Sequence, residues 1–333
     1  MRAQRNWSIA TLLITAGGLV GIPALVPNSL NSPGTAFSWL LLVGSSMHVA
    51  SSGWFLTEHD TRGIAKSSHV RYIWAPLVIL PTAVLLALLL SNQLRSVALV
   101  GFFAWQLFHF QKQNVGLASL MSGIDHVPAP KGLERQVLVW LGLIGSAAIV
   151  ANPHLVQVFP GWTQSHLIFN LLRWTFAAVA LAGVAQWFRR PRAERRVRSS
   201  SMYFLSLAYI TPIFLFSNPY RSIAALVIVH GCQYLILVAC FAGHASTSEQ
   251  RWRRLAIFTN ISVLGGVLLR LMSHGDLRSS GASRFIFGLF IGITMAHFVF
   301  DAGFWRLSIP KSRAIVSKNL PWLVKQPDER SVF

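Results

Sequence analysis

Histidine and aspartate lie one helical turn apart in the stretch AHFVFDAGFWR, residues 296–306, as His297 and Asp301. Side chains at positions i and i+4 of a helix share one face and lie within reach of each other. The surrounding run, from Phe285 to Trp305, is otherwise apolar enough for a membrane helix. An ionisable side chain at membrane depth is costly unless it faces the protein interior and has a partner, so we predict that Asp301 and His297 are catalytic residues.

Three further histidines lie inside other apolar runs, as His48, His109 and His230. If the runs are counted as membrane spans, these three and His297 occupy the second, fourth, eighth and tenth. Even-numbered spans cross a membrane in the same direction, which places the four imidazoles at a similar depth. Imidazole nitrogens and a carboxylate oxygen suit Fe, Mn, Cu or Zn. The predicted metal ligands are therefore His48, His109, His230, His297 and Asp301, with Asp301 either a fifth ligand or the base that orients His297.

Each of these histidines has a polar residue on its own helical face. Gln113 follows His109, Gln233 follows His230, and Ser45 and Ser52 flank His48. A metal-bound imidazole usually donates its second ring N–H to such a group, so Gln113 and Gln233 are predicted to orient the ligands from behind. The same spacing also arises where each histidine only satisfies its hydrogen bonds inside a helix bundle, and that alternative stays open.

The elements that must carry these residues are apolar runs of about 20 residues, the length that spans a bilayer. Of the 333 residues 53% are hydrophobic, and no stretch offers room for a soluble domain. We predict an all-α membrane helix bundle of about ten transmembrane helices, forming a single domain over residues 1–305 with a tail at 306–333. The spans are expected at 7–27, 35–56, 72–91, 95–112, 136–152, 166–188, 201–217, 221–243, 255–272 and 285–305.

The formal net charge of +19 is a topology signal in such a chain. Most of the 29 Lys and Arg residues fall in the segments that are cytoplasmic if the N-terminus is cytoplasmic, as the positive-inside rule requires. We therefore predict that both termini are cytoplasmic and that the protein is a multi-pass protein of a cell membrane, such as a bacterial inner membrane. The basic clusters then contact anionic membrane lipids, and no nucleic acid is expected as a partner.

Three stretches of the sequence resemble motifs of known membrane proteins. FHFQKQNVG at 108–116, VHGCQY at 229–234 and AHFVFDAGFWR at 296–306 are similar to the motifs YHxxxQxxG, HNxQY and HYxxDxxIWR, which a group of bacterial polytopic membrane proteins shares. Gly231 and Cys232 depart from the second motif. A looser likeness is to the bacteriorhodopsin-related membrane β-carotene dioxygenases, and it implies one iron held by histidines from several helices beside a hydrophobic tunnel.

These residues together favour a membrane-embedded, metal-dependent oxidoreductase, with non-haem iron as cofactor and a lipophilic small molecule as substrate. A single buried acid argues for one metal ion, since di-iron bundles use several glutamates. Three alternatives stay open: a haem-binding electron carrier with bis-histidine ligation, a proton-coupled transporter in which Asp301 and the histidines relay protons, and a subunit whose histidines only pack.

Overall fold

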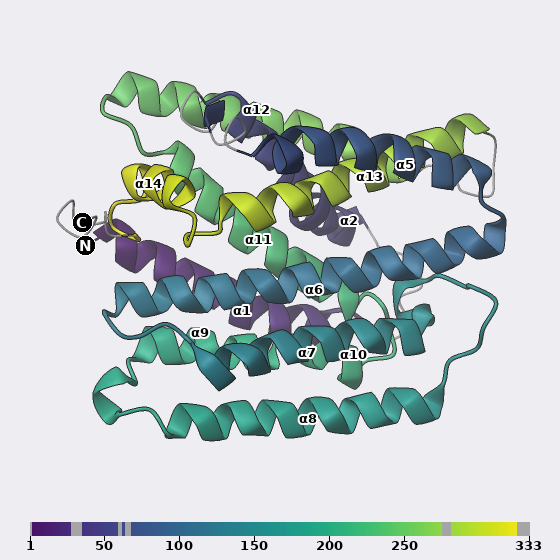
Figure 1. Cartoon of the computed structure of the whole chain (residues 1–333), viewed down its shortest axis with the longest axis horizontal. Coiled ribbons are helices and arrows are strands. Elements are labelled where there is room, and N and C mark those ends of the chain that lie inside the picture. Colours follow the sequence, from purple (N-terminus) through teal and green to yellow (C-terminus); the bar gives the residue numbers. More distant parts are fainter. Residues whose placement is uncertain (1, 28–34, 59–61, 64–67, 275–280, 325–333) are drawn as a thin grey trace. The chain divides into compact units, whose positions relative to one another are not determined.

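The chain is mostly helical in the part that the structure, a computed structural model, describes, namely residues 2–27, 35–58, 62–63, 68–274 and 281–324 (Figure 1). Within these ranges no residue is assigned to a strand. Beyond its first turn a helix pairs its backbone N–H groups with carbonyls of the same segment, which an apolar run needs where no water is available. The predicted all-α class is confirmed for these residues, whereas residues 325–333 of the predicted tail lie outside them.

Seven helices are long and apolar enough to cross a membrane within the described residues, as expected of a membrane-embedded helical protein. Each one overlaps a predicted span, and the ends agree to within five residues except at the start of α12, which begins seven residues before the predicted position 255. They are α1 (Arg2–Leu25), η3 with α5 (Val70–Trp74 and Ala75–Leu89), α7 (Gly132–Ala151), α8 (His166–Phe188), α11 (Ile223–Ala242), α12 (Ser248–Ser273) and α13 (Gly281–Phe304).

The other three predicted spans are helical but are not single apolar helices of that kind. The segment 35–56 is divided into α2 (Thr35–Leu41), the π-helix η1 (Leu42–Met47), α3 (His48–Ser51) and the 3₁₀-helix η2 (Ser52–Leu56). The segment 95–112 belongs to α6 (Asn92–Ile124), whose 33 residues are about 50 Å long. The segment 201–217 divides into α9 (Val197–Ala208) and α10 (Thr211–Leu215), with Pro212 at the start of α10. The count of ten spans therefore stays a prediction.

Two compact units account for the described residues. The first unit comprises Trp39–Asn92 and Gly231–Phe333, and within it α5 packs along α13 (Figure 1). The two helices approach closely because Gly288 has no side chain: a Cβ there would lie 2.8 Å from the Cα of Val84. The short helix α14 (Pro310–Asn319), in the predicted tail, belongs to the same unit, and its Ser312 hydroxyl donates to the Gly303 carbonyl at 3.4 Å.

The second unit comprises Arg2–Ser38 and Gln93–His230. Its core is apolar, and Gln111 joins three of its helices, because its Nε2 donates to the carbonyls of Leu138 and Ser206 at 3.1 and 3.0 Å. Arg190, just beyond α8, forms two hydrogen bonds with the Glu134 carboxylate. Hydrogen bonding to Glu134 raises the pKa of Arg190 above its ordinary value, so this cation stays charged at any physiological pH.

Candidate metal centre

His48 is positioned by a break in regular helix. It follows directly on the π-helix η1, and π-helical turns are frequent at functional sites. Two glycines of the same unit let other helices contact this turn. A Cβ on Gly231 of α11 would overlap the Gly44 carbonyl, and one on Gly266 of α12 would lie 2.9 Å from the Cα of Met47. The tight packing leaves the His48 side chain with no exposed surface.

His297 and Asp301 lie on one face of α13, as their spacing predicted. Both are buried, at 4% and 5% exposed. The Nε2 atom of His297 lies 3.5 Å from Oδ2 of Asp301, which is long for a hydrogen bond but close for two groups that can share a cation. The pair therefore supplies one imidazole nitrogen and one carboxylate oxygen at the same point.

Ser52 and Tyr234 link this pair by three hydrogen bonds, which together with the 3.5 Å contact of His297 and Asp301 complete a ring of four side chains. The Tyr234 hydroxyl donates to Oδ1 of Asp301 at 2.7 Å, the Ser52 and Tyr234 hydroxyls lie 2.8 Å apart, and Ser52 Oγ lies 2.7 Å from Nδ1 of His297. The four side chains come from η2, α11 and α13 of the first unit. The ring holds the imidazole and the carboxylate in one orientation from both sides.

Sequence reasoning missed Tyr234 and misplaced Ser52. Tyr234 ends the VHGCQY motif, one turn after His230, and this spacing was the available signal. Ser52 was noted as a neighbour of His48 on its own helix, but its hydroxyl contacts His297 and Tyr234. Nearness along the chain identified the right serine and the wrong histidine.

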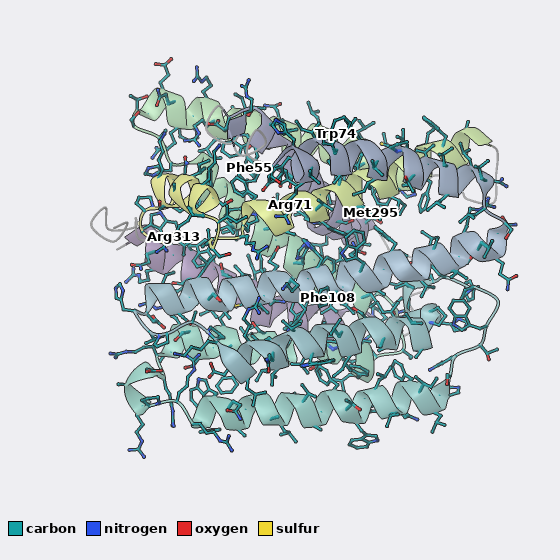
Figure 2. The ribbon with its side chains drawn as sticks, viewed as in Figure 1. Phe55, Arg71, Trp74, Phe108, Met295 and Arg313 are labelled. Atoms are coloured by element: carbon teal, nitrogen blue, oxygen red, sulfur yellow. The ribbon has the colours of Figure 1, made fainter. Side chains whose placement is uncertain are left out.

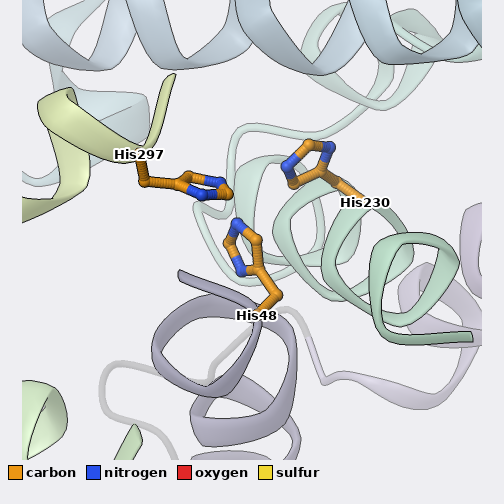
Figure 3. A group of neighbouring side chains, drawn as sticks. All are labelled: His48, His230 and His297. Carbon is orange, nitrogen blue, oxygen red and sulfur yellow. The ribbon is translucent and has the colours of Figure 1, made fainter. Parts of the chain in front are cut away.

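The His48 ring packs edge-on against His297, with centroids 5.0 Å apart and planes at 76°, and against Tyr234 at 5.9 Å. These are ordinary edge-to-face contact distances. His48 and His297 are drawn in Figure 3 together with a third buried histidine, His230. Two of the four predicted histidine ligands therefore meet in the first unit, beside Asp301.

The other two predicted histidines contact each other in the second unit. The rings of His109 and His230 have centroids 5.1 Å apart, and Phe110 stacks on His230 at 4.1 Å. Gln113, predicted to orient His109, donates its Nε2 hydrogen to the main-chain carbonyl of His230 at 3.1 Å. Gln233 is 1% exposed. His230 is the last residue of the second unit, and Tyr234 belongs to the first. Both residues lie on helix α11.

All five predicted ligands carry an atom that could bind a metal ion, an imidazole nitrogen or a carboxylate oxygen. Of these residues, His48, His297 and Asp301 lie in the first unit, and His109 and His230 lie in the second. His109 is partly exposed and the other four are buried. Their binding to one shared ion stays a prediction.

An aromatic layer adjoins the site in the first unit. Phe55, labelled in Figure 2, contacts Phe304 at 4.2 Å and Phe241 at 5.5 Å between ring centroids, and Tyr234 itself lies 6.3 Å from Trp305. These side chains follow His48, Tyr234 and His297 by about two turns on their helices. They surround the polar ring with apolar material, which strengthens electrostatic interactions inside it.

No protein-family model matches this chain, and neither a curated protein nor a solved structure does so. The resemblances of the three sequence motifs therefore stay predictions. The chemistry of the site must be inferred from the side chains and distances given above.

Proposed function

We propose that this protein is a membrane-embedded, metal-dependent oxidoreductase with a mononuclear non-haem iron and a lipophilic substrate. The observation that carries the proposal is the 3.5 Å separation of His297 Nε2 and Asp301 Oδ2 in a buried site. At this separation the imidazole nitrogen and the carboxylate oxygen would both be able to bind the same cation.

The remaining ligands of this proposal are His48, His109 and His230. Nitrogen-rich sites with one carboxylate and an open position suit non-haem iron and oxygen chemistry. Asp301 supplies the negative charge that partly neutralises the cation, and a buried charge of either sign is otherwise costly. The scarcity of buried acid favours one ion over a di-iron centre, which needs several carboxylates.

A lipophilic substrate fits the surroundings of the site. The outward faces of the apolar helices carry large exposed side chains, such as Trp74 (Figure 2), Leu77 and Leu268, which are 59%, 58% and 59% exposed. Such faces suit lipid, and a substrate dissolved in the bilayer would reach the protein through them. The proposal includes ten spans in a bacterial inner membrane with both termini cytoplasmic, supported by the distribution of Lys and Arg.

The two rival functions fit the geometry less well. Haem needs a flat slot between its two imidazoles, whereas the rings of His48 and His297 are in direct edge-to-face contact. A proton path must lead from one membrane face to the other, whereas the three hydrogen bonds of Ser52 and Tyr234 and the 3.5 Å contact of His297 with Asp301 form a closed loop.

The test is metal analysis and an absorption spectrum of the purified full-length protein. We expect about one iron per chain, no Soret band, and loss of the metal in His297→Ala but not in His154→Ala, which removes an exposed histidine. A Soret band would select the haem-binding carrier. Absence of metal after supply of iron during expression and purification would refute the proposed function.

A further inference from the structure

The hydrogen positions in the ring of Ser52, Tyr234, Asp301 and His297 follow from counting donors. A tyrosine hydroxyl has one hydrogen, and when Asp301 is ionised that of Tyr234 must point to Oδ1, which lies 2.7 Å away. Tyr234 must therefore accept at its second contact, which makes Ser52 the donor across the 2.8 Å between their hydroxyls. The donor of each hydrogen bond in the ring thus determines which group donates in the next one.

The same count decides which nitrogen of His297 carries hydrogen. The single hydrogen of Ser52 is used on Tyr234, so Ser52 Oγ can only accept at its 2.7 Å contact with His297 Nδ1. Nδ1 must then be an N–H. In a neutral imidazole the hydrogen-bond partner of one nitrogen determines the state of the other, so Nε2 carries a lone pair directed toward the side of Asp301 Oδ2.

We propose that Ser52 and Tyr234 are positioning residues that hold His297 in its Nδ1–H tautomer and thereby make Nε2 and Asp301 Oδ2 a preformed pair of cation ligands. Free histidine in water favours the opposite tautomer, so the two hydroxyls impose this state. The inference deepens the proposed metal site, and its use in chemistry rests on that function. The tautomer itself is a property of the metal-free protein.

Burial makes this arrangement effective. Ser52 is 8% exposed, Tyr234 1% and His297 4%, so bulk water does not compete for the hydroxyl and ring hydrogens. The four groups are fixed by three separate elements, η2, α11 and α13. A ring of the opposite direction would need a hydrogen on Asp301 Oδ1 and would place the histidine hydrogen on Nε2. Ring-nitrogen chemical shifts distinguish the two directions.

The experiment is nitrogen NMR of the full-length, metal-free protein with ¹⁵N-labelled histidine, in which the His297 signals are those lost in His297→Gln. We expect a protonated Nδ1 and an unprotonated Nε2 in the wild type. Ser52→Ala should move the hydrogen to Nε2, and Ser52→Thr should restore the wild-type pattern because it keeps the hydroxyl. The matched control is Ser51→Ala, which removes a neighbouring buried hydroxyl bound to the His48 carbonyl at 2.6 Å.

Tyr234→Phe provides a second route if Ser52→Ala does not fold. Without the tyrosine hydroxyl, Ser52 is released to donate to His297 Nδ1, so the hydrogen should again move to Nε2. Tyr209→Phe is its control, because Tyr209 is equally buried and its hydroxyl donates to the Leu226 carbonyl at 2.7 Å. An Nε2–H or a doubly protonated ring in the wild type would overturn the inference, as would unchanged signals in both test variants.

A cobalt(II) titration separates this inference from the proposed function. Co²⁺ reports a nitrogen–oxygen site by its visible absorption, and we expect Ser52→Ala to raise its dissociation constant about tenfold, as is typical for residues that orient a ligand. Equal cobalt affinity in Ser52→Ala and the wild type would overturn the positioning role. If the wild type bound no Co²⁺ while the NMR pattern held, the metal function would fail and the tautomer assignment would stand.

Discussion

Asp301→Asn tests the site most directly, because it removes the negative charge and keeps the shape. If the proposed metal site exists, the Asp301 carboxylate that this change removes is itself a ligand of the ion. A residue that only orients a metal ligand is worth about 10- to 100-fold in affinity. Loss of Asp301 should therefore weaken metal binding about 100-fold or more, equivalent to about 2.8 kcal/mol.

The fold should tolerate this change. The amide oxygen of Asn can still accept the Tyr234 hydroxyl hydrogen that Asp301 Oδ1 accepts at 2.7 Å. Replacing a buried charge by a neutral group of the same shape is often nearly neutral, so we expect the metal-free stability to change by about 1 kcal/mol or less. Membrane insertion and the gel-filtration profile should match those of the wild type.

The assay is metal content after purification together with a Co²⁺ titration. Glu134→Gln is the matched control, since it makes the same acid-to-amide change at a buried carboxylate of the second unit. His297→Ala should lose as much affinity as Asp301→Asn, and the double variant little more, because two ligands of one ion act as a unit. Unchanged metal content and affinity in Asp301→Asn would refute the reasoning. If Asp301→Asn abolished pH-dependent transport while the metal content stayed unchanged, the result would favour the proton-coupled transporter.

Three further outcomes are expected. Gly231→Ala forces a Cβ into a backbone carbonyl, so it should lower the thermal midpoint and the metal content, whereas Gly101→Ala, with nothing within 4 Å, should do neither. Glu134→Gln should lower thermal stability by leaving Arg190 without its carboxylate. Because the pKa of Arg190 is raised, its charge is lost only at very alkaline pH, so this deficit should be constant between about pH 6 and 9. Reporters fused after the FRRPRAERRVR segment and at the C-terminus should both report cytoplasm, and a periplasmic signal from either would contradict the predicted topology.

The apolar runs were sufficient to predict the helices. A run of about 20 apolar residues has few alternatives to a helix once water is excluded, and the seven long apolar helices match predicted spans. Helical periodicity was equally sufficient for His297 and Asp301, because their contact lies within one turn of one helix. Where a polar residue or a proline interrupts the pattern, prediction was weaker: α6 runs on to Ile124, and α10 begins afresh at Thr211.

Tertiary structure decided which residues contact the turn of α13 that carries His297 and Asp301. Ser52 and His297 are 245 residues apart in the chain, and Ser52 and Tyr234 are 182 apart. Their contact depends on how closely η1, α11 and α12 approach, which Gly231 and Gly266 permit by lacking side chains. A sequence pattern records which residues share a face of one helix, because helix geometry is local. It does not record which face of another helix will be packed against them, because that depends on the shapes of all the side chains between.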